Sequence, residues 1–380
     1  MHRVLFIFGT RPEAIKLAPV IHILKKRKKT FAAAVCVSAQ HREMLDQVLN
    51  IFHLKPDYDL NLMKNNQSLF DLTARSISGL KTIIEREKPD IIVVQGDTTT
   101  AFVGSLVAYY LKIKIGHVEA GLRTGDKYNP FPEEMNRKLA DCVADIYFAP
   151  TEQAKNNLLN EGVREEKVYI TGNTVIDALY HIHKQQKNLR QQAKLKRWFL
   201  NKYAIDVDKQ KIILVTGHRR ESFGEDFKRI CIGLKMIAEA TQEVKIIYPV
   251  HLNPNVQKPV LQILPGISNI HLIEPLDYYK FVWLMSKAYL VLTDSGGIQE
   301  EAPSLGKPVL VMRKVTERPE GIRAGTAKLV GTDSNSIFYE TLNLLVNTDE
   351  YRKMVKAVNP YGDGHASERI RDALLHFLGE

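Results

Sequence analysis

Residues 290–302 combine residue types that can bind an anion. A short apolar run ends at Ser295-Gly296-Gly297 and a helical pattern begins at once, which predicts a strand, a tight turn and a helix. The first N–H groups of a helix lack intrahelical partners and lie at the positive end of its dipole. Glu300 or Glu301 can accept hydrogen bonds from sugar hydroxyls beside a bound phosphate. A nucleotide sugar fits this pattern; the alternative is an ordinary turn whose glycines serve packing.

Carboxylates, a histidine and cations occur in other segments that follow predicted strands. Carboxylates act as acid and base when burial shifts their pKa values, and an imidazole can bind a phosphate or donate a proton. The candidates are Arg11, Lys16, Asp97, Glu119, Glu133, Glu134 and His218. The alternatives are surface cations, a structural histidine, and salt bridges from the carboxylates to Arg123 and Arg137.

The elements that must position these residues alternate between strand and helix. Apolar runs lie at 4–8, 35–38, 91–95, 113–118 and 146–149, and again at 212–216, 244–250, 290–293 and 309–312. A helical pattern at 69–87 separates two of these runs, and 184–210 is predicted to be helix plus connector. Alternation of this kind predicts an α/β fold with parallel, doubly wound sheets in two domains. We place the first domain at 1–183 and the second at 184–365, followed by a final amphipathic helix.

The polar segments follow predicted strands in both halves of the chain. In open α/β sheets, ligands bind beyond the carboxyl ends of the strands. Five such ends carry ionisable groups, at 9–11, 95–98, 117–119, 217–221 and 294–297. This repetition predicts a ligand cleft between the two domains.

Composition limits the function classes. The chain has 380 residues, of which 44% are hydrophobic, and a formal net charge of +10, so it can bury a large core in two domains. Much of the positive charge lies at 25–29 and 184–211 without a nucleic-acid-binding motif, and we expect no nucleic-acid partner. Three widely spaced cysteines and the lack of a signal peptide or membrane span predict a cytoplasmic protein. No histidine or cysteine pattern has metal-ligand spacing, so we expect no metal.

Six stretches closely resemble the non-hydrolysing UDP-N-acetylglucosamine 2-epimerases, and the resemblance spans nearly the whole chain. The matching stretches are 8–16, 96–99, 116–123, 132–134, 216–221 and 294–303. The resemblance implies two Rossmann-like domains that face each other across a cleft, which is the GT-B architecture. It also implies that the final helix, 366–380, returns to the first domain.

The resemblance implies reversible conversion of UDP-N-acetylglucosamine to UDP-N-acetylmannosamine, a precursor of bacterial surface polysaccharide. No carbonyl acidifies the hydrogen at C2, so either a nicotinamide must oxidise the sugar or UDP must leave C1 as that proton is removed. The sequence has no nicotinamide-binding fingerprint, and we expect no cofactor. Elimination of UDP to a glycal, followed by readdition with protonation from the other face, would give the epimer.

The resemblance also assigns residues. Asp97, Glu119 and Glu133 would do the acid/base work, and His218 would stabilise the departing UDP. Phe281 would lie beside the uracil and Glu301 would bind the ribose. The positions that match UDP-binding positions of the family are Arg11, Lys16, Phe281, Ser295, Gly296, Gly297, Glu301 and Arg318.

Bacterial members of the family have a second UDP-N-acetylglucosamine site that activates the enzyme, and they are usually dimeric, so we expect a homodimer. The second site is matched by Gln40, Gln67, Glu133, Arg219 and His251, while Asn66 stands where some members have an arginine. Three other functions remain as alternatives. These are a hydrolysing epimerase that releases UDP and N-acetylmannosamine, a GT-B glycosyltransferase and a nucleic-acid-binding module.

Overall fold

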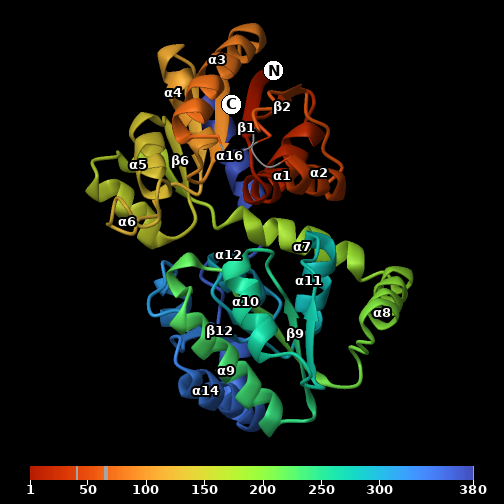
Figure 1. The fold of residues 1–380 in the computed structure, drawn as a ribbon. Helices are drawn as coiled ribbons and strands as arrows, with labels where there is room; N and C mark the ends of the chain where they lie inside the picture. Colours follow the sequence, from red (N-terminus) through yellow and green to blue (C-terminus); the bar gives the residue numbers. More distant parts are fainter. Residues whose placement is uncertain (40–41, 64–66, 380) are drawn as a thin grey trace. The chain divides into compact units, whose positions relative to one another are not determined.

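The computed structural model describes residues 1–39, 42–63 and 67–379 and divides the chain into two compact units. One unit comprises Met1–Ala178 and Tyr361–Glu380, and the other comprises Leu179–Pro360. The chain leaves the first unit within α7 (Thr174–Gln186) and returns to it just before α16 (Ala366–Leu378). Each unit is a parallel sheet with helices, which confirms the predicted α/β class with two Rossmann-like domains (Figure 1).

The sheet of the first unit places three predicted site segments next to one another. Its described strands run parallel in the order β3-β2-β1-β4-β5-β6-β7. Because β1, β4 and β5 are neighbours, the segments after their carboxyl ends begin side by side at Gly9, Gly96 and Glu119. The strands are β1 (His2–Phe8), β2 (Phe31–Val37), β3 (Tyr58–Asp59), β4 (Ile91–Gln95), β5 (Lys114–Val118), β6 (Ile146–Ala149) and β7 (Val168–Ile170).

Helices cover both faces of this sheet, which is why its central strands are nearly continuous apolar runs (Figure 1). On one face α1 (Arg11–Lys26) packs against α2 (Arg42–Ile51) and α16. On the other, α4 (Thr99–Tyr110) packs between α3 (Leu69–Glu87) and α5 (Glu133–Val143). The contact of α16 with α1 confirms the predicted return of the final helix. The unit also contains α6 (Glu152–Asn160) and the 3-10 turn η1 (Glu165–Lys167).

The second unit repeats this arrangement. Its described strands run parallel in the order β10-β9-β8-β11-β12-β13. Thr293 at the end of β11 is paired with Thr216 at the end of β8, and their hydroxyl oxygens are 2.6 Å apart. The segments that begin at Gly217 and Asp294 therefore leave the sheet at the same level. The strands are β8 (Lys211–Thr216), β9 (Val244–Pro249), β10 (Ile270–Ile273), β11 (Leu290–Thr293), β12 (Val309–Val311) and β13 (Ala327–Leu329).

The second unit contains eight helices that follow α7 and one 3-10 turn among its described residues. None of the described helices of the chain is long and apolar enough to cross a membrane. The helices are α8 (Leu189–Tyr203), α9 (Glu225–Ala240), α10 (Pro254–Ile263), α11 (Tyr278–Lys287), α12 (Gly296–Ser304), α13 (Pro319–Ala324), α14 (Ser334–Val346) and α15 (Thr348–Lys356), with the 3-10 turn η2 at Arg220–Ser222.

Candidate active site

Glu119 is a buried carboxylate at the carboxyl end of β5. Its backbone has the uncommon positive φ of 66°, and 7% of the residue is exposed. Both carboxylate oxygens lie 2.6 Å from the Lys16 ammonium, and the Asn173 amide donates at 2.9 Å. Gln95 also donates to it from the end of β4. Lys16, predicted to bind a phosphate, thus contacts a predicted acid/base residue in this structure.

Asp97 follows β4 and contacts α5. Its Oδ2 accepts a hydrogen bond from Arg137 at 2.5 Å, and its main-chain oxygen accepts one from Asn136 at 3.0 Å. The salt bridge to Arg137 is one that the sequence left as an alternative. About a third of the Asp97 side chain, 32%, remains exposed, so the carboxylate is both anchored and accessible.

The two glutamates at the start of α5 have different environments. Glu134 is fully buried and accepts hydrogen bonds from the N–H groups of Thr124 and Gly125 at 3.1–3.2 Å. Glu133 is partly exposed. Within the described chain its enclosed Oε2 atom has no hydrogen-bond partner. Glu134 therefore holds a loop, whereas Glu133 has carboxylate capacity left for a ligand.

His117 holds the segment that carries Asp97, a role that the sequence did not reveal. The fully buried ring places Nδ1 2.6 Å from Asp141 Oδ1 and Nε2 2.8 Å from the Gly96 carbonyl oxygen. Burial lowers the pKa of His117, but the Asp141 carboxylate and these hydrogen bonds outweigh it and raise the pKa above its ordinary value. Because both ring nitrogens face acceptors, this arrangement favours the doubly protonated imidazolium, which can donate from both.

Glu13 links the segments after β1 and β4. Its buried carboxylate accepts hydrogen bonds from the N–H groups of Gly9 and Thr10 at 3.0 and 2.7 Å, and from the Thr98 hydroxyl at 2.7 Å. Burial raises the pKa of Glu13 despite these bonds. The bonds from Gly9 and Thr10 fix the start of α1, where Arg11 is the first helical residue and is partly buried.

In the second unit, the predicted strand, turn and helix at 290–302 are present as β11, Asp294-Ser295 and α12. Ser295 is the N-cap residue, but its side chain makes no capping hydrogen bond to the described helix start. A Cβ added at Gly297 would meet nothing closer than Ser295 Oγ at 4.0 Å, and one at Gly296 would meet the Arg219 guanidinium at 3.6 Å. Neither glycine has a positive φ. Neither protein packing nor backbone conformation requires glycine here, so these positions leave the helix amides open to a ligand.

Asp294 and His218 lie beside this helix start. Asp294 is fully buried, and its Oδ2 accepts hydrogen bonds from the N–H groups of His218 and Arg219 at 2.6 and 2.8 Å. The His218 ring stacks on His251, with centroids 5.4 Å apart. Burial lowers the pKa of His218, and the neighbouring Arg219 and His251 lower this pKa further. The Asp294 carboxylate raises it, but the pKa of His218 stays below its ordinary value. The imidazole is therefore largely neutral near pH 7.

Glu301 on α12 is hydrogen-bonded to α11, the helix that also carries Phe281. Glu301 is 5% exposed and accepts a hydrogen bond from the Tyr278 hydroxyl at 2.5 Å. Phe281 is three residues after Tyr278 on α11 and therefore lies on nearly the same helix face. Its ring is partly exposed. The neighbouring glutamate, Glu300, instead pairs with Arg318.

The residues predicted for a second ligand site are distributed over both units. Gln40 and Asn66 lie outside the described residues. Gln67 accepts a hydrogen bond from Arg75 at 2.8 Å in the first unit. In the second unit, Arg219 lies 3.5 Å from Glu317, and His251 stacks on His218. Arg219 and His251 thus lie close to His218, whereas Gln67 and Glu133 belong to the first unit.

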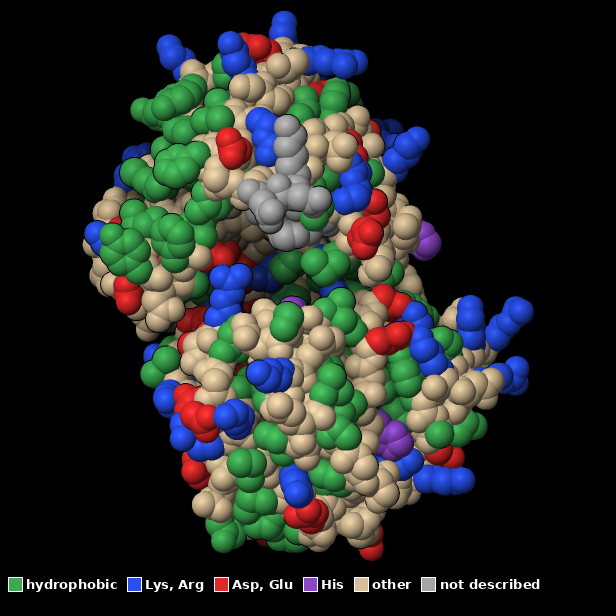
Figure 2. Space-filling view, viewed as in Figure 1, with side chains coloured by type: hydrophobic (Ala, Val, Ile, Leu, Met, Phe, Trp, Pro, Cys, Tyr) green, Lys and Arg blue, Asp and Glu red, His purple; other side chains and the backbone are tan. Residues whose placement is uncertain are grey.

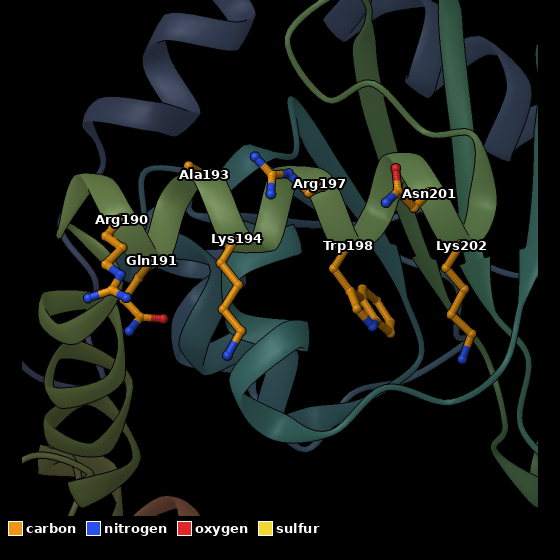
Figure 3. Close-up of a pocket in the computed structure, with 8 residues that line it drawn as sticks. All are labelled: Arg190, Gln191, Ala193, Lys194, Arg197, Trp198, Asn201 and Lys202. Carbon is orange, nitrogen blue, oxygen red and sulfur yellow. The ribbon is translucent and has the colours of Figure 1, made fainter.

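A groove of about 840 Å³ runs along α8 and contains none of the predicted site residues. Figure 3 shows the side chains of Arg190, Lys194, Trp198 and Lys202 on the same side of this helix. This is the basic connecting helix expected from the sequence. Across the described residues, no group of three or more His, Cys, Asp or Glu side chains is arranged to hold a metal ion.

Comparison with known proteins gives one consistent result. The UDP-N-acetylglucosamine 2-epimerase family model matches residues 24–375. The Salmonella typhimurium UDP-N-acetylglucosamine 2-epimerase is 56% identical over 375 residues, with 99% of each chain covered. The Campylobacter jejuni enzyme of the same name is 54% identical over 374 residues, which cover 98% of this chain and 97% of the relative.

Solved structures agree with the sequence relatives. The Neisseria meningitidis UDP-GlcNAc 2-epimerase, bound to UDP-GlcNAc, has a TM-score of 0.93 at 51% identity, with 98% of this chain and 100% of that chain covered. The Methanocaldococcus jannaschii enzyme, in complex with UDP-GlcNAc and UDP, has a TM-score of 0.81 at 35% identity, with 98% and 99% covered. The chain therefore belongs to the UDP-N-acetylglucosamine 2-epimerase family.

Proposed function

We propose that the chain interconverts UDP-N-acetylglucosamine and UDP-N-acetylmannosamine, with the sugar bound to UDP at the start and end of each cycle. The observation that carries this proposal is the open helix start at Ser295, Gly296 and Gly297, which lies next to the carboxylate that holds the His218 backbone. Such a helix start binds a pyrophosphate, and an imidazole beside it can stabilise the oxygen that leaves C1. The UDP-GlcNAc bound to the Neisseria meningitidis relative supports this ligand class.

The proposed reaction is an elimination followed by an addition. A base removes the proton from C2, the C1–O bond breaks, and its electron pair leaves with UDP to give a glycal. UDP then adds to C1 as an acid protonates C2 from the opposite face. The electrons that leave with UDP return with it, so the cycle needs no net oxidant or reductant.

The carboxylates Asp97, Glu119 and Glu133 are our candidates for the proton transfers. Asp97 follows β4, Glu119 follows β5 and Glu133 begins α5, and each carboxylate has a different set of partners. Positioned carboxylates are suited to general acid and base catalysis. Lys16 would contribute through its contact with Glu119 as well as by charge. Glu134 is excluded from this role because both of its carboxylate oxygens hold the Thr124–Gly125 loop.

The remaining UDP contacts belong to the same proposal. Gly296 and Gly297 give the pyrophosphate access to the helix amides, and Arg11 and Arg318 add positive charge. Glu301 would accept hydrogen bonds from ribose hydroxyls, and its bond to Tyr278 holds it in one orientation for this purpose. Phe281, on nearly the same face of α11 as Tyr278, would lie against the uracil.

We also propose the second, activating UDP-N-acetylglucosamine site, with Gln67, Glu133, Arg219 and His251 as ligands. The supporting observation is local: the Arg219 N–H is bonded to Asp294, and His251 stacks on His218. A ligand bound to Arg219 and His251 would therefore act on the segment that positions His218. Turnover that rises more steeply than first order with substrate would support this site, and a hyperbolic dependence would contradict it.

A homodimer is proposed from the exposed apolar side chains of the first unit. Figure 2 shows hydrophobic side chains gathered over α4 and α5. Tyr109 and Tyr110 at the end of α4 are 58% and 67% exposed, and Leu139 on the adjacent α5 is 41% exposed. Exposed groups of this kind mark interaction surfaces. Light scattering should give a molar mass twice the 43.2 kDa of one chain. A molar mass of one chain at micromolar protein concentration would contradict the proposal.

Product analysis tests the activity directly. The chain is incubated with UDP-N-acetylglucosamine alone, and the anomeric signals are followed by NMR. Two UDP-sugars in a stable ratio are expected, reached from either one. Accumulation of UDP with free N-acetylmannosamine would instead identify a hydrolysing epimerase, and turnover only with an added sugar acceptor would identify a glycosyltransferase.

A further inference from the structure

Asp294 has an unsatisfied oxygen at the edge of the proposed UDP site. The side chain is fully buried, and Oδ2 already accepts two main-chain hydrogen bonds, from His218 and Arg219. The other oxygen, Oδ1, is enclosed and has no hydrogen-bond partner within the described chain. The His218 Nδ1 atom lies 3.5 Å from it. A buried carboxylate oxygen without a donor is unfavourable, so this position favours a donor on the facing nitrogen.

The hydrogen bond from the His218 main chain to Asp294 keeps the imidazole close to the same carboxylate. Asp294 Oδ2 accepts a hydrogen bond from the His218 N–H at 2.6 Å. The backbone that carries the imidazole is therefore fixed next to the Asp294 carboxylate. A small rotation of the ring brings Nδ1 within hydrogen-bonding distance of Oδ1. Donation from Nδ1 then leaves Nε2 as the ring nitrogen available to a ligand.

We propose that Asp294 is a positioning residue that acts through His218: it holds the imidazole with a proton on Nδ1 and stabilises the imidazolium. The imidazolium forms when Nε2 takes up a proton from solvent before UDP departs, and its Nε2–H then donates to the departing UDP oxygen. This inference rests on the proposed elimination of UDP. The same carboxylate lies one residue before Ser295, the N-cap of α12. Asp294, directly after β11, is therefore hydrogen-bonded to the His218 main chain and adjacent in sequence to the proposed pyrophosphate-binding amides.

The charges around His218 make the contribution of Asp294 measurable. Burial lowers the pKa of the ring, Asp294 raises it, Arg219 and His251 lower it, and Glu221 raises it. Tyr248 is also near, since its hydroxyl donates to the Gly217 carbonyl at 2.9 Å. Without the Asp294 charge, only Glu221 opposes the effects of burial, Arg219 and His251 on the pKa of His218. The pKa of His218 should then fall further, and the protonated ring should form only at lower pH.

Asp294→Asn tests the inference because it preserves the size of the side chain and one acceptor oxygen. Accepting both main-chain N–H groups turns the amide NH₂ toward Nδ1, which then acts as acceptor and selects the wrong tautomer. We expect kcat to fall about a hundredfold, with UDP affinity by calorimetry within about threefold of wild type. In the His218→Ala background the same change should have little further effect, because the route through the imidazole is already removed.

Asp333→Asn is the matched control. Asp333 is the N-cap of α14 and accepts one main-chain hydrogen bond at 2.9 Å. It undergoes the same chemical change in the same unit, and among the described residues it has no hydrogen bond or ion pair with a histidine. We expect its kcat to be unchanged. Losses from Asp294→Asn and His218→Ala that multiply in the double variant would overturn the inference, because Asp294 would then act independently of His218.

A measurement on wild type needs no substitution and no turnover. Long-range ¹H–¹⁵N NMR of the neutral His218 ring should show the proton on Nδ1, and a proton on Nε2 would overturn the inference even if the chain is an epimerase. If UDP-N-acetylglucosamine is not converted but His218 is the Nδ1–H form and its pKa falls in Asp294→Asn, the pairing is supported and only the proposed reaction fails.

Discussion

Substitution of Gly297 by valine should separate ligand binding from folding. An added Cβ meets no protein atom closer than 4.0 Å, and Gly297 lacks a positive φ. The native fold therefore accepts the side chain, and valine is a better helix former than glycine by a few tenths of a kcal/mol. The branched side chain would instead project into the open space in front of the amides of α12. We expect the melting temperature to stay within about 2 °C of wild type.

The effect on UDP binding follows from the bonds that are lost. Hydrogen bonds to a charged group contribute roughly 1.5–3 kcal/mol each. Displacing the pyrophosphate from one or two amides should weaken binding by about 3 kcal/mol, or roughly a hundredfold in Kd at about 1.4 kcal/mol per tenfold. Gly297→Ala should give an intermediate loss because one methyl group blocks less space.

Titration calorimetry with UDP measures these effects. Ala193→Val is the matched control, because it adds a branched side chain to an exposed position of α8 in the same unit. Its Kd for UDP should equal that of wild type. If folded Gly297→Val binds UDP within threefold of wild type, the start of α12 does not bind the pyrophosphate and the proposed function loses its main support.

Three further predictions test the chemistry and its framework. Replacing Asp97 by Asn, or Glu119 or Glu133 by Gln, should lower kcat by about a hundredfold or more while UDP binds nearly as well; a large loss of UDP affinity would contradict the acid/base assignment. In D₂O without added nicotinamide, the product epimer should carry deuterium at C2, and full retention of the original hydrogen would exclude the elimination route. Because folding raises the pKa of His117, protonation of this ring increases the free energy of unfolding. The full increase is present below about pH 6.5 and is lost as the pH rises through the pKa of the folded state. The melting temperature of wild type should therefore exceed that of His117→Gln most near pH 6 and by less toward pH 9, and a difference that does not narrow would show that the buried ring is neutral.

The sequence indicated the central strands more reliably than the edges of the sheets. The strand at 91–95 and the helix at 69–87 are confirmed as β4 and α3, because a run buried on both faces and a long helical period are strong local signals. The edge strands β3, β7, β10 and β13 were not predicted. They have two to four residues, too few to show a period, and they form because a neighbouring strand supplies hydrogen-bond partners.

Some of the candidate site could be recognised from local order alone. Ser295-Gly296-Gly297 between an apolar run and a helical pattern predicted an open helix start, and the structure has α12 beginning at Gly296. Small residues at a helix N-terminus expose amides whatever the rest of the fold does, because the missing hydrogen bonds are a property of the helix itself. The amino-acid sequence by itself thus determined the fold class, the family resemblance and the position of the open helix start at Gly296.

Tertiary structure decided how the ionisable groups are used. Glu133 and Glu134 are adjacent and chemically identical, yet only Glu134 has both oxygens bonded to the Thr124–Gly125 loop. Asn173 reaches Glu119 across 54 residues, and Asp294 binds the His218 main chain across 76. Such partners meet because the order of parallel strands places particular carboxyl ends side by side. Burial and charge pairing depend on that spatial order, so no local pattern of residues could determine them.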